Sequence, residues 1–119
     1  MKLKIHSCGV SDCPPWWNWI TASSGFADYD LWTVFRGRGK LISQTEEQTE
    51  FHIHEGASLL LSPNIRYKAF HEPNYPLLVI NVHFDFLDDN GTPIYPKTLS
   101  AKSIDDSEFM RSLLMRTVT

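Results

Sequence analysis

The stretch FHIHEGASLLLSPNIRY, residues 51–67, combines turn residues with a buried run in a pattern that predicts β-structure. Gly56 is typical of a turn, and the run from Ala57 to Leu61 is short and rich in leucine, as expected of a buried strand. Pro63-Asn64 ends this run, because proline fixes φ and has no N–H, and asparagine tolerates the left-handed region of tight turns. The stretch therefore predicts a turn, a buried strand, a second turn and the start of another strand.

Working outward, the rest of the chain has the same character. Further strands are predicted at 28–35, 40–42, 51–54, 67–70 and 77–86, with a short strand or arm at the N-terminus. The strand 77–86 has one face with Leu78, Ile80, Val82, Phe84 and Phe86, and another with Leu77, Val79, Asn81, His83 and Asp85. Short strands separated by turn signals such as Asn90-Gly91 favour an all-β barrel or sandwich.

The hydrophobic period changes near the C-terminus. Ser103, with Asp106 three residues later, is close to a capping box and predicts the start of a helix. An apolar stripe then follows at helical spacing, made of Phe109, Met110, Leu113 and Leu114. The sequence stops at Thr119 without a C-cap signal, so we expect the natural chain to continue. We expect a homodimer that uses either this stripe or strands of the β-structure.

Composition limits the possible classes of function. A chain of 119 residues is one domain by length, and 42% hydrophobic residues indicate a globular protein. The net charge of −3 argues against direct DNA binding by this segment, which would need a basic patch. No apolar run approaches the roughly 20 residues of a membrane span, and the N-terminus lacks the apolar stretch of a signal peptide. A cytoplasmic location without membrane contact is therefore expected.

Two cysteines lie close together near the N-terminus. Cys8 and Cys13, with His6 nearby, have a spacing that allows a metal site or a disulfide. Free thiols are the preferred interpretation, because two cysteines alone do not make a metal-binding pattern and a reducing compartment is expected.

Three tryptophans occur within four positions. Trp16, Trp17 and Trp19 follow a Pro-Pro pair that interrupts any regular element. Indole rings carry a large apolar area, so one interpretation is core packing. The other is a stacking surface for a ligand such as a sugar, and both can hold at once.

A series of short motifs carries a resemblance to a known family. In chain order they are Asp28-Tyr29-Asp30-Leu31-Trp32, Phe35-Arg36-Gly37-Arg38-Gly39, Glu55-Gly56 to Pro63, His71-x-Pro73, and Val82-His83-Phe84-Asp85. The ordered series resembles the N-terminal, effector-binding domain of AraC-type bacterial transcription regulators over about residues 16 to 116. That resemblance implies a cupin-like double-stranded β-helix, or jelly-roll, barrel followed by helices.

The resemblance also implies a domain organisation. Residues 1–15 would form an N-terminal arm, 16–100 the ligand-binding barrel, and 101–119 the start of a truncated helical dimerisation segment. A DNA-binding domain with two helix-turn-helix motifs would follow in the whole regulator and is absent from this sequence. The implied partners are a small-molecule effector, expected to be a carbohydrate, a second copy of the chain, and DNA only through the missing domain.

The metal ligands of catalytic cupins are largely missing. Gly56 and Pro63 match the second cupin motif, but Tyr67 stands where metal-binding members have a histidine. Asp30 stands at the position of the family's glutamate, and no histidine occurs between Cys8 and Phe51. We therefore expect no metal, no cofactor and no catalytic residues.

His52 and His54 offer an alternative metal site. Two histidines at alternate positions share one strand face, which is acceptable ligand geometry. Two polar side chains on a solvated face are the simpler interpretation, and it is the one preferred here.

The resemblance points to a set of ligand-binding residues that face into the barrel. They are Asp30, Trp32 and Val34 on one strand, Val79, Asn81 and His83 on another, and Tyr67 at the former ligand position. Indole could stack on a sugar ring, and the polar side chains could bind hydroxyl groups. Structural roles in the barrel interior are the alternative for each.

Three hypotheses of function follow. The preferred one is the effector-sensing domain of a transcription regulator. The alternative is a stand-alone metal-dependent cupin enzyme that acts on a sugar or small acid through His52 and His54. A third is a dimerisation module whose barrel is filled by its own side chains.

Overall fold

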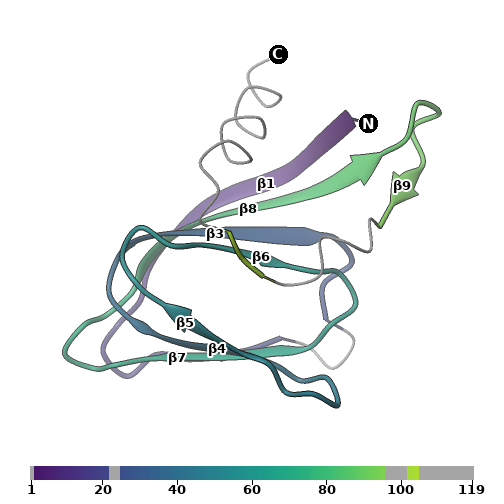
Figure 1. Ribbon diagram of the computed structural model, residues 1–119. Helices are drawn as coiled ribbons and strands as arrows, with labels where there is room; N and C mark the ends of the chain where they lie inside the picture. The colour runs from purple at the N-terminus through teal and green to yellow at the C-terminus, as the bar shows by residue number, and fades with distance from the viewer. Residues whose placement is uncertain (1, 22–24, 96–101, 105–119) are drawn as a thin grey trace.

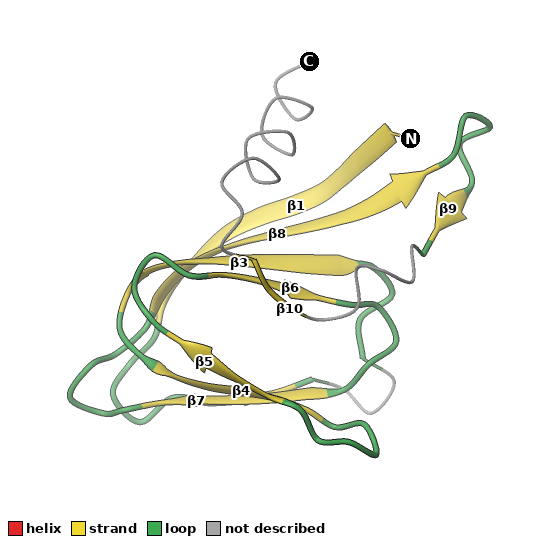
Figure 2. Cartoon of the chain, viewed as in Figure 1, coloured by secondary structure: helices red, strands yellow, loops and turns green. Residues whose placement is uncertain are grey.

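The computed structural model describes residues 2–21, 25–95 and 102–104, and every regular element within these ranges is a strand (Figure 2). The strands are β1 Lys2–Asp12, β2 Asn18–Ile20, β3 Tyr29–Arg36, β4 Gly39–Ser43, β5 Glu50–Ile53, β6 Ser58–Leu61, β7 Tyr67–His71, β8 Leu78–Leu87, β9 Pro93–Ile94 and β10 Lys102–Ile104.

The strands form two antiparallel sheets that face one another (Figure 1). One sheet has the order β1-β8-β3-β6-β10, with β9 also paired to β8, and the other has the order β2-β7-β4-β5. Strands β1 and β8, β2 and β7, β3 and β6, and β4 and β5 are hydrogen-bonded pairs. This nested pairing is that of a long antiparallel ribbon rolled up on itself, which is the arrangement of a jelly roll. The prediction of an all-β jelly roll is confirmed.

Turn chemistry fixes the reversals between strands. Gly37, between β3 and β4, has φ of 96°, and a Cβ there would lie 2.5 Å from the carbonyl oxygen of Pro76. Only glycine combines that backbone conformation with so close a neighbour. Asn64, in the predicted turn after β6, has φ of 61°, in the left-handed region that asparagine tolerates.

Apolar side chains gather on both faces of the larger sheet. The inner core lies between the sheets and contains Cys13, Trp32, Val34, Leu41, Ile53, Leu59, Leu61, Tyr67, Ala69, Leu77 and Val79. The outer cluster lies on the opposite face and contains Tyr29, Leu31, Leu60, Phe84 and Phe86, with Leu3, Ile5, Val82 and Ile94 packed against it. Strands β3 and β8 contribute to both, because successive side chains of a strand point to opposite faces.

A β-bulge in β1 lets this strand, too, place side chains in the outer cluster and in the barrel interior. The pairing with β8 passes from Ile5 opposite Phe84 to Ser7 opposite His83, so His6 is an extra residue in β1. Ile5 therefore packs on the outer cluster, while Ser11, further along the same strand, lines the barrel interior.

Several boundaries differ from the sequence-based expectations. The segment expected as an arm forms the long edge strand β1, and β2 includes Trp19 from the tryptophan-rich segment. Lys102–Ile104 pairs with β6 as β10, so the chain is extended at Ser103, where a helix start was predicted. The remainder of the predicted helix and its apolar stripe lies outside the described residues.

Candidate ligand-binding cavity

A cavity of about 130 Å³ lies inside the barrel, between the two sheets. It is lined by Ser11, Cys13, Trp17, Trp19, Phe26, Asp30, Trp32, Val79, Asn81 and His83. This volume is close to that of the roughly 150 Å³ protein cavity known to bind benzene. The cavity therefore suits a ligand, or part of a ligand, about the size of a single ring.

The register of β3 and β8 assembles the wall of the cavity from opposed pairs. Asp30 lies opposite His83, and Trp32 lies opposite Asn81. The next pair on this face, Val34 opposite Val79, continues the row into the inner core. Room for Asn81 comes from Gly9 on β1, where a Cβ would lie 3.0 Å from the amide oxygen of Asn81.

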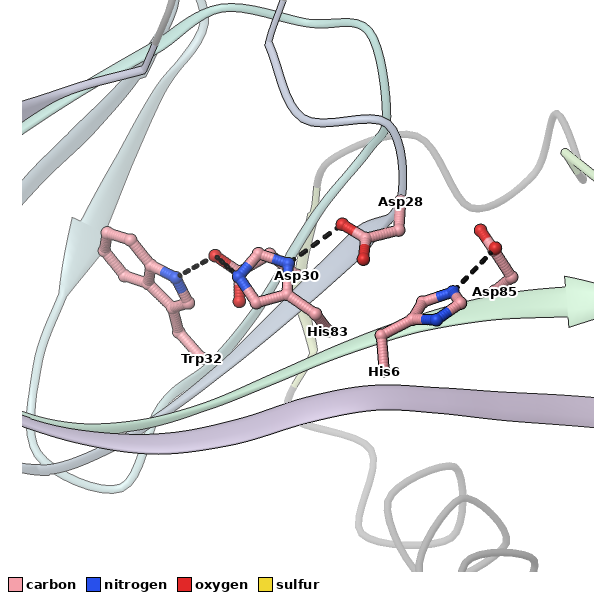
Figure 3. A network of polar contacts seen from close by, with 6 residues as sticks. All are labelled: His6, Asp28, Asp30, Trp32, His83 and Asp85. Atoms are coloured by element: carbon pink, nitrogen blue, oxygen red, sulfur yellow. Dashed lines mark hydrogen bonds and ion pairs between the residues drawn. The ribbon is translucent and has the colours of Figure 1, made fainter.

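A chain of polar contacts runs along this wall (Figure 3). The indole Nε1–H of Trp32 donates to Asp30 Oδ2 at 2.8 Å. His83 Nδ1–H donates to Asp28 Oδ1 at 2.9 Å, because a carboxylate can only accept. His83 Nε2 lies 3.6 Å from Asp30 Oδ2, which is an electrostatic contact but too long for a hydrogen bond. His83 is therefore held between two carboxyl groups.

Asp30 is a deeply buried acidic side chain in the wall of the cavity. Its side chain is only 4% exposed, and within the described residues its Oδ1 atom has no hydrogen-bond partner. Burial raises the pKa of Asp30 from 3.8 to about 6, and the neighbouring Asp28 acts in the same direction. The Trp32 hydrogen bond and His83 act in the opposite direction. A buried acceptor without a partner costs free energy, so it calls for an explanation.

Aromatic rings form the opposite side of the cavity. The Trp19 ring centroid lies 5.1 Å from that of Trp32 and 6.0 Å from that of Phe26. Phe26 in turn meets the His83 ring edge-on, with centroids 4.8 Å apart. Trp17, Trp19 and Phe26 are only half-buried, in contrast to Asp30. The cavity therefore combines π-faces with one deeply buried carboxyl group.

The connecting segment 13–17, between β1 and β2, is fastened to the barrel by a buried histidine. The Leu77 N–H donates to His71 Nδ1 at 3.1 Å, which leaves Nε2 to carry the proton. Nε2–H then donates to the Pro15 carbonyl oxygen, also at 3.1 Å. The Trp17 and His71 ring centroids lie 5.3 Å apart. His71 thus positions the segment that brings Trp17 to the cavity.

Five of the seven residues predicted to bind a ligand line this cavity, namely Asp30, Trp32, Val79, Asn81 and His83. The other two, Val34 and Tyr67, are buried in the inner core and do not line it. The Tyr67 hydroxyl instead accepts a hydrogen bond from the Ser62 N–H at 2.9 Å. Contact of any of the seven with a ligand stays a prediction.

Sequence reasoning left four contributors out of the predicted site. Asp28, Ser11, Cys13 and Phe26 were not named as ligand-binding residues, because nothing local in the sequence marks a residue whose role depends on a distant strand. Trp17 and Trp19 were recognised as a possible stacking surface, and both line the cavity. Cys8 and Cys13 are free thiols, the first exposed and the second buried.

His52 and His54 lie away from the cavity. Both are exposed, and they line a separate hollow of about 480 Å³ with Lys40, Phe70 and other residues of β4, β5 and β7. Phe70, Lys40 and His52 lie directly opposite one another across these strands. Among the described residues, no group of three or more His, Cys, Asp or Glu side chains is arranged to hold a metal ion.

The comparisons with known proteins concern this architecture as a whole. No protein-family model matches the chain, and no curated protein sequence matches it. Solved structures with the same jelly-roll fold do match. One is ToxT from Vibrio cholerae, with a TM-score of 0.63 and 14% identity, covering 100% of this chain and 48% of that protein. At this identity the similarity establishes the fold.

A second match is ToxT from Vibrio cholerae O395 bound to (E)-4-(8-methylnaphthalen-1-yl)but-3-enoic acid. It has a TM-score of 0.62 and 14% identity, and covers 99% of this chain and 48% of that protein. The chain thus spans about half the length of the structures that it matches.

In the described part of the chain there is no helix with the length and apolar character needed to cross a membrane.

Proposed function

We propose that this chain is the effector-binding domain of an AraC-type transcription regulator, and that a small molecule in the barrel cavity controls a DNA-binding domain of the longer protein. The cavity carries the proposal, because a barrel built only for dimerisation gains nothing from a buried Asp30 Oδ1 that has no partner among the described residues. The fold match supports it, since ToxT is an AraC-family regulator and one of the matched structures holds a small organic ligand.

The expected effector is a carbohydrate. Trp19 and Trp32 offer flat apolar surfaces for the C–H face of a sugar ring. Asp30, Asn81 and His83 offer acceptors and donors for its hydroxyl groups. We propose that the whole regulator works as a cytoplasmic homodimer, is not an enzyme, and contacts DNA only through its other domain.

The source gene tests the regulator proposal directly. Sequencing beyond the codon for Thr119 is expected to show two helix-turn-helix motifs. A stop codon at that point would remove the output domain, and the stand-alone enzyme and binding hypotheses would take its place.

A thermal-shift panel of monosaccharides tests the effector proposal on the purified chain. A ligand present at 100 times its Kd adds about 2.7 kcal/mol to the free energy of unfolding, which raises Tm by several degrees. A sugar that raises Tm is then expected to change transcription from a promoter controlled by the whole regulator. A sugar that binds without any transcriptional effect would contradict a sensing role.

A further inference from the structure

Three features of the cavity are not required by the fold. Asp30 Oδ1 is buried without a partner among the described residues. Of the described residues that line the cavity, none is lysine or arginine. The rings of Trp17, Trp19, Trp32 and Phe26 surround the same space. Among the described residues, one histidine, His83, faces two carboxyl groups, those of Asp28 and Asp30. The described polar network at the cavity therefore carries more acidic than basic side chains.

We propose that the cavity binds its ligand through a protonated primary amine, with the ammonium group against Asp30 and the body of the ligand against the indole rings. This inference rests on the effector-binding function proposed above; it specifies the charged group of the small molecule and leaves its ring as either a sugar or an aromatic ring. The shared chemistry is a compact, ring-sized primary ammonium ion. An amino sugar and an arylalkylamine both provide it.

Charge favours an ammonium group over the alternatives. A ligand hydroxyl could donate to Asp30 Oδ1, but it would leave the buried carboxylate to share His83 with Asp28 as its only basic neighbour among the described lining residues. An ammonium group supplies both the donor and the charge, and charge-assisted hydrogen bonds are about twice as strong as neutral ones. A ligand carboxylate would meet Asp30 and Asp28 with no lysine or arginine from the described lining. The cavity is therefore least suited to an acid.

The aromatic rings of the cavity also favour a cationic ligand. The π-face of tryptophan attracts a cation more strongly than that of any other side chain, and the attraction grows when water is excluded. Trp32 is nearly buried, and its Nε1–H already binds Asp30 Oδ2, so the indole and the carboxyl group are held side by side. The π-faces for a cation would come from the other rings that line the cavity, Trp17, Trp19 and Phe26.

The unpartnered oxygen selects a primary amine over a quaternary one. A trimethylammonium group has the charge but no N–H, so it would leave Asp30 Oδ1 without a hydrogen bond. A primary ammonium group has three donors in a small volume, which suits a cavity of about 130 Å³ that must also admit the adjoining ring.

Matched probes separate these possibilities by titration of tryptophan fluorescence. The sugar series is glucosamine, glucose, N-acetylglucosamine and glucuronate. The aryl series is benzylamine, benzyl alcohol and benzyltrimethylammonium. We expect the primary amine of at least one series to bind about tenfold or more tighter than its hydroxyl partner. The series in which this happens identifies the ligand's source as sugar or aromatic.

A pair of charge-removing variants tests the role of Asp30. Asp30→Asn keeps the shape of the side chain but removes the charge, and it is expected to abolish the preference for the amine. Asp85→Asn removes the same charge from β8 outside the cavity, where Asp85 pairs with His6 at 2.8 Å, and should leave that preference intact. The binding of the amine by the unaltered protein should also weaken below about pH 6, because Asp30, which faces Asp28, His83 and Trp32, then becomes protonated.

The outcomes separate this inference from the broader function. Glucose binding as tightly as glucosamine, or glucuronate binding most tightly, would overturn the amine but leave a small-molecule sensor. Equal binding of benzylamine and its trimethyl analogue would also overturn it. If no probe binds up to about 10 mM, where even millimolar affinities register, the amine inference fails. The gene sequence beyond Thr119 and the transcription measurements on the whole regulator then test the regulator proposal independently of the amine.

Discussion

At the scale of single residues, the buried carboxyl group of Asp30 lowers the stability of the folded chain at neutral pH. Its pKa in the folded state is about 6, above the ordinary value of 3.8, so the folded chain holds a proton that the unfolded chain releases between these values. The free energy of unfolding therefore falls as the pH rises through this window and stays lower above it. The ionised carboxylate is thus present at neutral pH at a cost to the stability of the protein, and it is this form that the proposed ammonium ligand would bind.

Asp30→Asn should consequently be more stable than the unaltered protein at pH 7. We expect a gain of about 2 kcal/mol, because the neutral amide can still accept from Trp32 but carries no buried charge. The gain should vanish below about pH 4, where the aspartate is protonated as well. Urea denaturation across this pH range measures it. A loss of stability at pH 7 would show that His83 and Trp32 compensate the ionised carboxylate fully.

His71 is a structural residue whose two ring nitrogens are both in use. His71→Leu would leave the buried Leu77 N–H without its partner, at about 1–3 kcal/mol, and would release the Pro15 carbonyl, which water can reach because Pro15 is exposed. His54→Leu is the matched control, because His54 is exposed and its ring makes a hydrogen bond to the adjacent Glu55 carbonyl oxygen, which water can replace. Denaturation curves should show a large loss for the first variant and almost none for the second. Equal effects would contradict the anchoring role of His71.

At the scale of elements, the approach of β4 to β7 depends on a missing side chain. A Cβ on Gly39 would clash with the carbonyl oxygen of Phe70, and it would lie 2.7 Å from the Cα of His71. Gly39→Ala must therefore force two paired strands apart. Gly56→Ala meets no atom within 4 Å and bears only the strain of φ at 83°.

We expect Gly39→Ala to lower the free energy of unfolding well beyond the roughly 1 kcal/mol that left-handed strain costs at Gly56. Thermal denaturation of the two variants compares them directly. If Gly56→Ala proved the more harmful, the close contact between β4 and β7 would not be a constraint in solution.

The elements also show what sequence patterns can and cannot predict. Strands β3 and β8 alternate without interruption over the residues that line the cavity or pack in the two clusters, so their two faces were readable from the sequence. The two faces of strand β1 could not be read from the sequence. The bulge at His6 resets the alternation of its side chains, and its inner face carries Ser11 and Gly9 rather than apolar residues. The opposition of Asp30 and His83 depends on register between strands more than fifty positions apart, which no local pattern encodes.

At the scale of the whole molecule, the inner core and the outer cluster should unfold together. Both include residues of β3 and β8, so neither can be lost while the other keeps its strands. Leu31→Ala, in the outer cluster, is expected to cost about 2–5 kcal/mol. It should lower the midpoint of unfolding by the same amount whether unfolding is followed by tryptophan fluorescence, which reports mainly on the inner side, or by circular dichroism. Separate transitions by the two methods would show independent units.

The alternation along β3 and β8 has a consequence for how such a protein can diversify. Positions that face the cavity, such as Asp30 and His83, are interleaved with positions that face the outer cluster, such as Leu31 and Phe84. Substitutions in the first set would change the chemistry of the cavity without altering the buried side chains on the opposite face. One scaffold can therefore acquire a new cavity lining while the packing on the other side of the same strands is inherited unchanged.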